Sequence, residues 1–366
     1  MNGEFSQEER ARARAYHRPL YLGLALDAAL AAGLLAALAW TPLGRWLFSP
    51  LGSLPPEAAA AAYAALVTTS SSLVHTPVAF WRGWRRERRW GFSTQSFGGW
   101  LADRGKGLAV SLVLGATAWT ATVALAGTLP GWWALPAGAA LALAVLLLSF
   151  VAPVVLEPIF NRFRPLEDEA HARDLRLLSE RAGVPVRSVL VADASRRTTK
   201  VNAYVSGMGR TRRVVLFDTL LQAADPAEVQ VVVAHELGHR RDRHVAKLTV
   251  LAMTGAAVAV AVLWAVLGTR IAEPRTLPKA LLLLFALELV ALPAGAWLSR
   301  RFERAADRCS LDLTREPAAF ARAHVELARR NLSDLEPPRL VYLLLFSHPT
   351  PPERLALGRA WEASYS

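Results

Sequence analysis

Two residue types that often carry structural information are scarce in this sequence. Cysteine occurs once, at Cys309, among 366 residues, so an intrachain disulfide is excluded. Lysine supplies only four of the 42 basic side chains, and this arginine bias is typical of a GC-rich, bacterial source. Charged residues make up only 20% of the chain and hydrophobic residues 53%, which argues against an ordinary soluble protein. We interpret Cys309 as a small core residue rather than a nucleophile or a metal ligand.

The hydrophobic residues are gathered in runs long enough to cross a bilayer, which takes about 20 residues of helix. We predict six spans, at 20–40, 58–81, 108–129, 132–156, 245–267 and 277–298. The second is the weakest, because its middle is polar and His75 follows. The first is too long for a cleaved signal peptide. Asp27, His75 and Glu288 lie within or beside these spans and are expected to face protein or water, and His75 is favoured as a structural residue.

The net charge of +12 raises the question of nucleic-acid binding, but the charges are placed as in a membrane protein. They stand before the first span (Arg10, Arg12, Arg14, Arg18) and between the second and third (Arg82, Arg85, Arg86, Arg88, Arg89, Arg104, Lys106). The loop after the first span has Arg45 as its one basic residue. Arg270 and Arg275, in the loop between the last two spans, fit the pattern less well. The positive-inside rule then predicts an integral protein of the bacterial cytoplasmic membrane, with both termini and residues 157–244 in the cytoplasm. The expected partners of the basic loops are membrane lipids, not nucleic acid.

The most informative motif is His235-Glu236-Leu237-Gly238-His239. Two histidines four apart share one side of a helix and can hold a single zinc ion. Glu236 then lies beside the open coordination position, where it can take a proton from the attacking water. Asp225, Pro226 and Glu228 have the pattern of a helix start. The alternative is a surface helix with two solvated histidines, which the apolar residues just before His235 disfavour.

The third predicted ligand is Glu303, just after the last span. Because two spans return the chain to the side from which it started, Glu303 and His239 are expected near the same interface. If the last span continues as a helix, Asp307 follows on the same face, where it can orient a zinc-bound histidine. A direct acid role for Asp307 is also open. The alternative is that both carboxylates merely pair with nearby arginines, Arg300, Arg301 or Arg304.

Four segments are predicted from these patterns. They are an N-terminal membrane domain with four transmembrane helices (1–156), a cytoplasmic α/β segment with the zinc helix (157–244), a transmembrane hairpin (245–299) and a C-terminal helical segment with the third ligand (300–366). Within the α/β segment we expect a helix over 166–182 and strands over 188–191, 201–205 and 214–217, the second closing at Gly207-Met208-Gly209. The run 340–346 is apolar but too short to cross a membrane.

Several stretches together resemble the type I CAAX prenyl proteases, which are integral-membrane zinc metallopeptidases. They are the zinc helix at 235–239, the segment Ser299-Arg300-Arg301-Phe302-Glu303-Arg304-Ala305-Ala306-Asp307, Asn202-Ala203-Tyr204 with 213–221, 91–96, 157–160, and Ser347-His348-Pro349 with Glu353-Arg354-Leu355. Coverage is nearly the whole chain. The resemblance implies a mainly α polytopic membrane protein in which about six transmembrane helices enclose a water-filled chamber, with a cytoplasmic α/β, gluzincin-like zinc metallopeptidase domain.

The resemblance also implies a substrate site. Peptide would add to the strand bearing Asn202 and Ala203 by backbone pairing. His348 is open to two interpretations, binding the substrate or its oxyanion, or serving as a structural histidine before a proline. The expected partner is a peptide or protein substrate, with lipidated and membrane-associated forms both open.

The sequence therefore predicts a membrane-embedded zinc metalloendopeptidase acting near the cytoplasmic membrane face. Two alternatives stay open. One is a heat-shock-type protease for quality control of membrane proteins, which shares the two histidines and a downstream glutamate. The other is a non-enzymatic membrane protein whose chamber binds a lipid or peptide.

Overall fold

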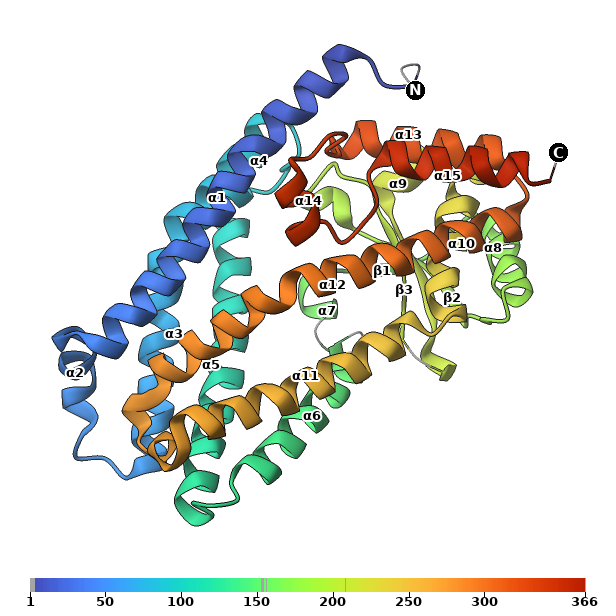
Figure 1. Ribbon diagram of the computed structural model, residues 1–366. Coiled ribbons are helices and arrows are strands. Elements are labelled where there is room, and N and C mark those ends of the chain that lie inside the picture. The colour runs from blue at the N-terminus through green and yellow to red at the C-terminus, as the bar shows by residue number, and fades with distance from the viewer. Residues whose placement is uncertain (1–3, 153–154, 156, 208, 366) are drawn as a thin grey trace.

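The computed structural model describes residues 4–152, 155, 157–207 and 209–365. The end of the predicted span 132–156 and Met208 therefore lie partly or wholly outside the described residues. Helices dominate, and a small sheet lies at one end of the molecule (Figure 1). This arrangement confirms the predicted fold class, a mainly α polytopic membrane protein with an α/β domain.

Six long helices correspond to the six predicted spans. They are α1 (Gln7–Trp40), α3 (Pro56–Phe80), α5 (Phe97–Thr128), α6 (Ala134–Val151), α11 (His244–Leu267) and α12 (Leu277–Thr314). All except α3 are apolar enough, as well as long enough, to cross a membrane. The exception is the span whose polar middle made it the weakest prediction. Short helices α2 (Pro42–Phe48) and α4 (Arg86–Arg89) lie in the connections.

The long helices pack in pairs, α3 with α5, α6 with α11, and α1 with α12. Large apolar side chains on their outer faces stay exposed, among them Leu22, Val113 and Val290 at 66–77%. An apolar surface of this extent is unfavourable in water and is stabilised by contact with lipid. The helices therefore form the membrane domain.

Asp27, His75 and Glu288 face protein or a cavity, as expected. Asp27 forms an ion pair with Arg82. His75 Nδ1 lies 2.8 Å from the carbonyl oxygen of Ser71, and its Nε2 lies 3.2 Å from that of Asp27. Glu288 lines a cavity of about 680 Å³ between the helices, with His75 among its other lining residues. A cavity with both polar and apolar lining residues inside the helices agrees with the expected chamber.

The sheet has four strands in the order β1-β2-β4-β3: β1 (Phe163–Pro165), β2 (Ser188–Ala192), β3 (Ala203–Ser206) and β4 (Arg213–Phe217). Strand β2 is parallel to β4, and the other pairs are antiparallel. Strand β3 stands at the edge and, within the described part of the chain, pairs only with β4. The strands β2, β3 and β4 confirm the three predictions to within two residues. Strand β1 was not predicted, because three residues including a proline give no recognisable alternation.

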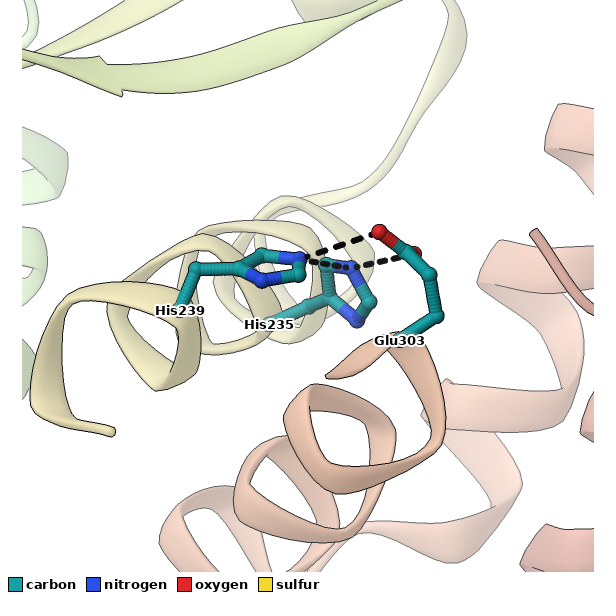
Figure 2. Close-up of side chains that lie close together, drawn as sticks. All are labelled: His235, His239 and Glu303. Carbon is teal, nitrogen blue, oxygen red and sulfur yellow. Dashed lines mark hydrogen bonds and ion pairs between the residues drawn. The ribbon is translucent and has the colours of Figure 1, made fainter. Parts of the chain in front are cut away.

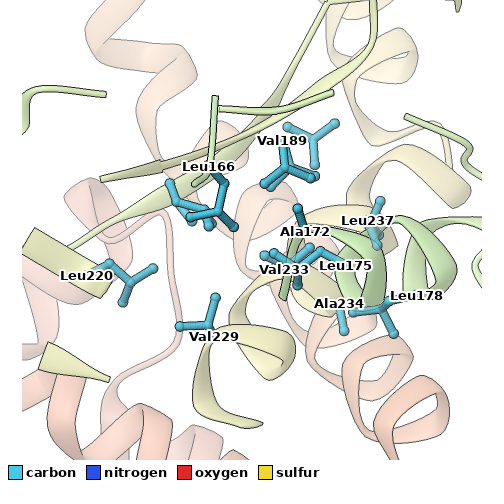
Figure 3. Packing of buried hydrophobic residues seen from close by; sticks show 14 of the residues in the cluster. Leu166, Ala172, Leu175, Leu178, Val189, Leu220, Val229, Val233, Ala234 and Leu237 are labelled. Atoms are coloured by element: carbon cyan, nitrogen blue, oxygen red, sulfur yellow. The ribbon is translucent and has the colours of Figure 1, made fainter. Parts of the chain in front are cut away.

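Two helices cover the sheet and enclose its hydrophobic core, α8 (Glu169–Arg181) and α10 (Pro226–Arg241) (Figure 3). Helix α8 contributes Leu175 and Leu178, each 0% exposed. Helix α10 contributes Val233 and Leu237, also 0% exposed. The remaining helices, α7 (Glu157–Phe160), α9 (Asp218–Ala223), α13 (Pro317–Asn331), α14 (Arg339–Leu345) and α15 (Pro351–Ala363), connect or surround this unit. The short apolar run over 340–346 is thus part of a helix of seven residues.

The membrane domain is tied to the segment leading into β3. Lys200 Nζ donates to Glu87 Oε2 at 2.6 Å and to the Tyr16 hydroxyl at 2.8 Å. The next residue, Val201, is held through both backbone groups by the side chain of Asn331, each bond being 3.0 Å long. These contacts fix the position of the residues just before β3.

Replacing Leu175 with alanine should destabilise the α/β domain, because it removes a fully buried side chain from the core. The expected loss is about 2–5 kcal/mol in the free energy of unfolding, seen as a lower melting temperature of the detergent-purified protein. Leu177→Ala is the matched control, since Leu177 is on the same helix and 50% exposed. Equal melting temperatures for the two variants would contradict this description of the core.

Candidate metal centre

Helix α10 begins as the sequence predicts. The Asp225 side chain accepts from the backbone N–H of Glu228 at 2.9 Å, and Glu228 accepts in return from the N–H of Asp225 at 3.3 Å. Pro226 occupies the first turn. With the apolar side of α10 fixed in the sheet core, His235 and His239 share the side that faces α12.

Gly238 allows α10 and α12 to pack unusually closely. A Cβ at Gly238 would lie 3.0 Å from the Cβ of Cys309 and 3.1 Å from the Cα of Ala306 on α12. Any larger residue would push the helices apart. Cys309 is buried in this contact, as expected of a small core residue.

Helix α12 is continuous from the membrane to Thr314, which confirms the predicted helical extension. It brings Glu303 to the histidine pair (Figure 2). Glu303 Oε2 lies 3.2 Å from His235 Nε2, and Oε1 lies 3.3 Å from His239 Nε2. The two Nε2 atoms are 3.2 Å apart. The three predicted ligands therefore converge, and the solvated-histidine alternative is not what the structure shows.

The geometry of this group fits a zinc ion. Zinc bound tetrahedrally at about 2.0 Å has neighbouring ligand atoms about 3.3 Å apart. The observed separations of 3.2–3.3 Å match one face of such a tetrahedron. The donor set of two imidazoles and one carboxylate also suits zinc, and it leaves a fourth position open, as in catalytic sites.

A buried carboxylate stands behind the histidines. Asp307 is 0% exposed, and its Oδ1 lies 2.8 Å from His235 Nδ1. This contact fixes the ring so that Nε2 points at the candidate metal position. The structure thus brings Asp307 to the nitrogen of His235 that faces away from that position, which agrees with an orienting role.

Arg354 was not predicted as a site residue. It donates to Glu303 Oε2 and to Asp307 Oδ1, each at 2.7 Å. Arg300, which the alternative paired with these carboxylates, instead donates to the carbonyl oxygens of Tyr342 and Phe346. Two buried carboxylates with one arginine leave one negative charge, which a cation between the histidines would balance. The motif containing Arg354 was visible in the sequence, but no spacing rule linked it to Glu303.

Burial is the main cause of the pKa shifts of the neighbouring titratable groups. Burial raises the pKa of the Glu236 carboxyl above its ordinary value, although the nearby His235 and His239 act in the opposite direction. Burial, helped by the charge of Arg354, lowers the pKa of His324 to about 3, so its imidazole is neutral. A raised pKa is the direction that suits a carboxylate serving as a general base.

A cleft of about 560 Å³ opens onto the centre. Glu236, His235, His348 and Asn202 are among the residues that line it. His348 Nε2 lies 3.4 Å from Glu303 Oε1, while its side chain stays 60% exposed. Asn202 is exposed, whereas Ala203 is buried at 2% on β3 and does not line this cleft. The structure thus brings His348 to the metal centre and places Asn202 at the rim.

Comparison with known proteins matches both halves of the chain to related families. Residues 165–362 match peptidase family M48, and residues 1–162 match the family described as CAAX prenyl protease N-terminal, five membrane helices. The first match covers more than half of the chain, which therefore belongs to peptidase family M48. The range 1–162 contains four long helices, as predicted, and the short helix α2 between the first two.

Individual relatives agree. The chain is 30% identical over 224 residues to the Bacillus subtilis protein named Uncharacterized metalloprotease YhfN, covering 57% of this chain and 52% of that protein. It is 29% identical over 189 residues to CAAX prenyl protease 1 of Saccharomyces cerevisiae, covering 50% and 41%. Its fold is similar to the crystal structure of S. mikatae Ste24p, with a TM-score of 0.85 and 23% identity over 97% of this chain and 90% of that one. The chain spans about half the length of the two curated relatives. These matches confirm the predicted resemblance to the CAAX prenyl proteases.

Replacing Glu303 with alanine should lower zinc occupancy, because it removes the one ligand that α12 supplies. Metal content measured by mass spectrometry at a fixed free zinc concentration would show the loss. Glu288→Ala is the matched control, since Glu288 is an exposed carboxylate on the same helix. Full occupancy in the Glu303 variant would assign the third ligand elsewhere.

Proposed function

We propose that this protein is a zinc metalloendopeptidase that hydrolyses peptide bonds beside the membrane. One observation carries the proposal: His235, His239 and Glu303 converge from two helices with the separations of a zinc site. A zinc ion held there would act as a Lewis acid on the peptide carbonyl and on the attacking water. Membership of peptidase family M48 supports this assignment.

The residues of the chain have distinct roles in this proposal. Glu236 lines the cleft beside the histidines and takes the proton from the attacking water. It then returns that proton to the leaving amine, and its raised pKa favours holding it in between. His348, whose Nε2 lies 3.4 Å from Glu303 Oε1, would donate from that ring to the carbonyl oxygen as negative charge develops. Asp307 orients His235 and is a positioning residue rather than the acid.

The substrate would lie in the cleft along β3. Within the described chain no other strand pairs with the outer edge of β3, although Arg240 donates to the Val205 carbonyl oxygen there. Asn202, just before the strand, lines the cleft. An extended peptide that adds to such an edge gains backbone hydrogen bonds without regard to side chains. Asn202 and the backbone of Ala203 would then position the peptide. Because the cleft also reaches apolar residues of α1 and α14, lipidated and membrane-associated substrates fit as well as plain peptides.

The location follows from the same elements. The basic residues in the N-terminal part of α1 and around α4 lie at the end of the membrane domain that carries the metal centre. We therefore place this end, both termini and the active site in the cytoplasm, in a bacterial membrane. We keep the four predicted segments as the domain division of the chain. The hairpin α11–α12 then joins the two parts of the metal centre.

Replacing Glu236 with glutamine should abolish peptide hydrolysis, with turnover lower by a factor of about 100 to 10,000, while zinc binding persists. The assay compares prenylated with unmodified peptides, with and without a chelator. Glu180→Gln, an exposed change on α8, is the control. Wild-type turnover in the Glu236 variant would contradict the proposed base. Function that survives both the variant and the chelator would favour the non-enzymatic alternative, and cleavage of misfolded membrane proteins alone would favour quality control.

Replacing Asp307 with alanine should weaken zinc binding by a factor of about 10–100, because His235 loses the group that orients its ring. Zinc competition titrations would measure this affinity. Once saturated with zinc, the variant should keep most of its turnover, because Asp307 touches no substrate in this proposal. A saturated variant with no turnover would instead assign Asp307 a direct acid role.

A further inference from the structure

A second cleft lies at the end of the membrane domain opposite the metal centre. Helix α11 starts beside α10 and ends at Leu267, and α12 starts at Leu277 and reaches Glu303 only after roughly 40 Å of helix. The connection between them, with α2 and the end of α1, surrounds a cleft of about 1080 Å³. These elements gather at the lower left in Figure 1, far from the sheet.

The lining of this cleft combines cations with apolar walls. Its basic residues are Arg45, Arg270, Arg275 and Lys279, and its acidic residue is Glu273. The Arg275 side chain donates to Glu273 at 2.8 Å. By contrast, Arg45 and Lys279 are exposed and have no ion-pair partner among the residues that the structure describes. The apolar part is supplied by residues such as Trp40, Phe48 and Leu282. The cleft therefore carries an excess of positive charge beside hydrocarbon-like surface.

The elements that carry the cations are fixed before any ligand arrives. A Cβ at Gly44 would lie 1.8 Å from the carbonyl oxygen of Leu38, so only glycine lets α2 fold back this tightly onto α1. In the other connection, Trp119 Nε1 donates to the carbonyl oxygen of Pro274 at 3.1 Å. The Thr276 hydroxyl donates to the carbonyl oxygen of Arg270 at 2.8 Å. Such anchoring lowers the entropy lost when a ligand is bound.

Positive charge at this end is costly for membrane insertion. Lysine and arginine are retained on the side where the basic loops lie, and that side carries the metal centre. Four cations lie at the opposite end, contrary to this bias. The neighbouring turn between α5 and α6 has no cation. A bound anion would offset the cost of placing the four cations there.

We propose that this cleft binds an anionic phospholipid from the leaflet at the end of the membrane domain away from the metal centre. The phosphate lies between Arg45 and Lys279, and an acyl chain lies along the wall that includes Trp40 and Leu282. Charge complementarity selects the anion, and the apolar wall selects a ligand with a hydrocarbon chain over a soluble one. The bound lipid fastens α2 and the hairpin connection to each other.

The test measures lipid binding to the intact detergent-purified protein by native mass spectrometry. Phosphatidylglycerol is titrated against phosphatidylcholine, with glycerol phosphate and inorganic phosphate as separate competitors. The variant Arg45→Gln/Lys279→Gln should bind phosphatidylglycerol about 30-fold more weakly, since each cation near an anionic lipid contributes a factor of about five. Arg173→Gln/Arg181→Gln is the matched control, because it removes the same charge from exposed positions on α8, outside the membrane domain. Melting temperature and peptidase turnover show that each variant is folded.

The outcomes separate the sources of the anion. Loss confined to the Arg45/Lys279 variant, with no competition by the soluble phosphates, supports the site. Equal loss in both double variants would reduce the effect to overall charge and overturn the proposal. Displacement by millimolar inorganic phosphate would overturn it too, because the cleft would then be a soluble-anion site. Equal affinity of the wild-type protein for both lipids would mean that the cations select nothing.

Discussion

The close packing of α10 against α12 is the contact on which the metal centre depends. One helix is fixed by the sheet core, and the other runs without a break out of the membrane domain. Because Gly238 has no side chain, the backbones come close enough for a carboxylate on one helix to lie 3.2–3.3 Å from two imidazoles on the other. The ligand geometry is thus determined by rigid helices, which hold a site more accurately than loops do.

Charge imposes a second constraint on the same contact. Glu303 and Asp307 are 6% and 0% exposed, and unpaired buried carboxylates would be strongly destabilising. Arg354 bridges them from the first turn of α15, which is itself fixed by a capping box between Thr350 and Glu353. The C-terminal helix therefore belongs to the metal centre as much as the two helices that carry the ligands.

The sequence was sufficient wherever a feature depends on local periodicity. The start of α10, the spacing of its histidines and the continuation of α12 to Glu303 are all local, and all three predictions are confirmed. Strand β1 was missed because its stability comes from pairing with β2, not from its own three residues. Arg354 was missed as a partner of Glu303 because only the tertiary fold brings α15 to α12. Five of the six predicted spans are helices long and apolar enough to cross a membrane, because hydrocarbon thickness fixes the length of a crossing. The sixth, α3, has a polar middle and does not meet that criterion.

The division of the ligands between α10 and α12 has a consequence for biogenesis. A nascent chain that has reached Arg243 holds two histidines and the neighbouring glutamate, but no third ligand. Glu303 arrives only after the hairpin α11–α12 has entered the bilayer and returned, and Arg354 arrives later still. A chain that fails to insert this hairpin cannot assemble the complete centre.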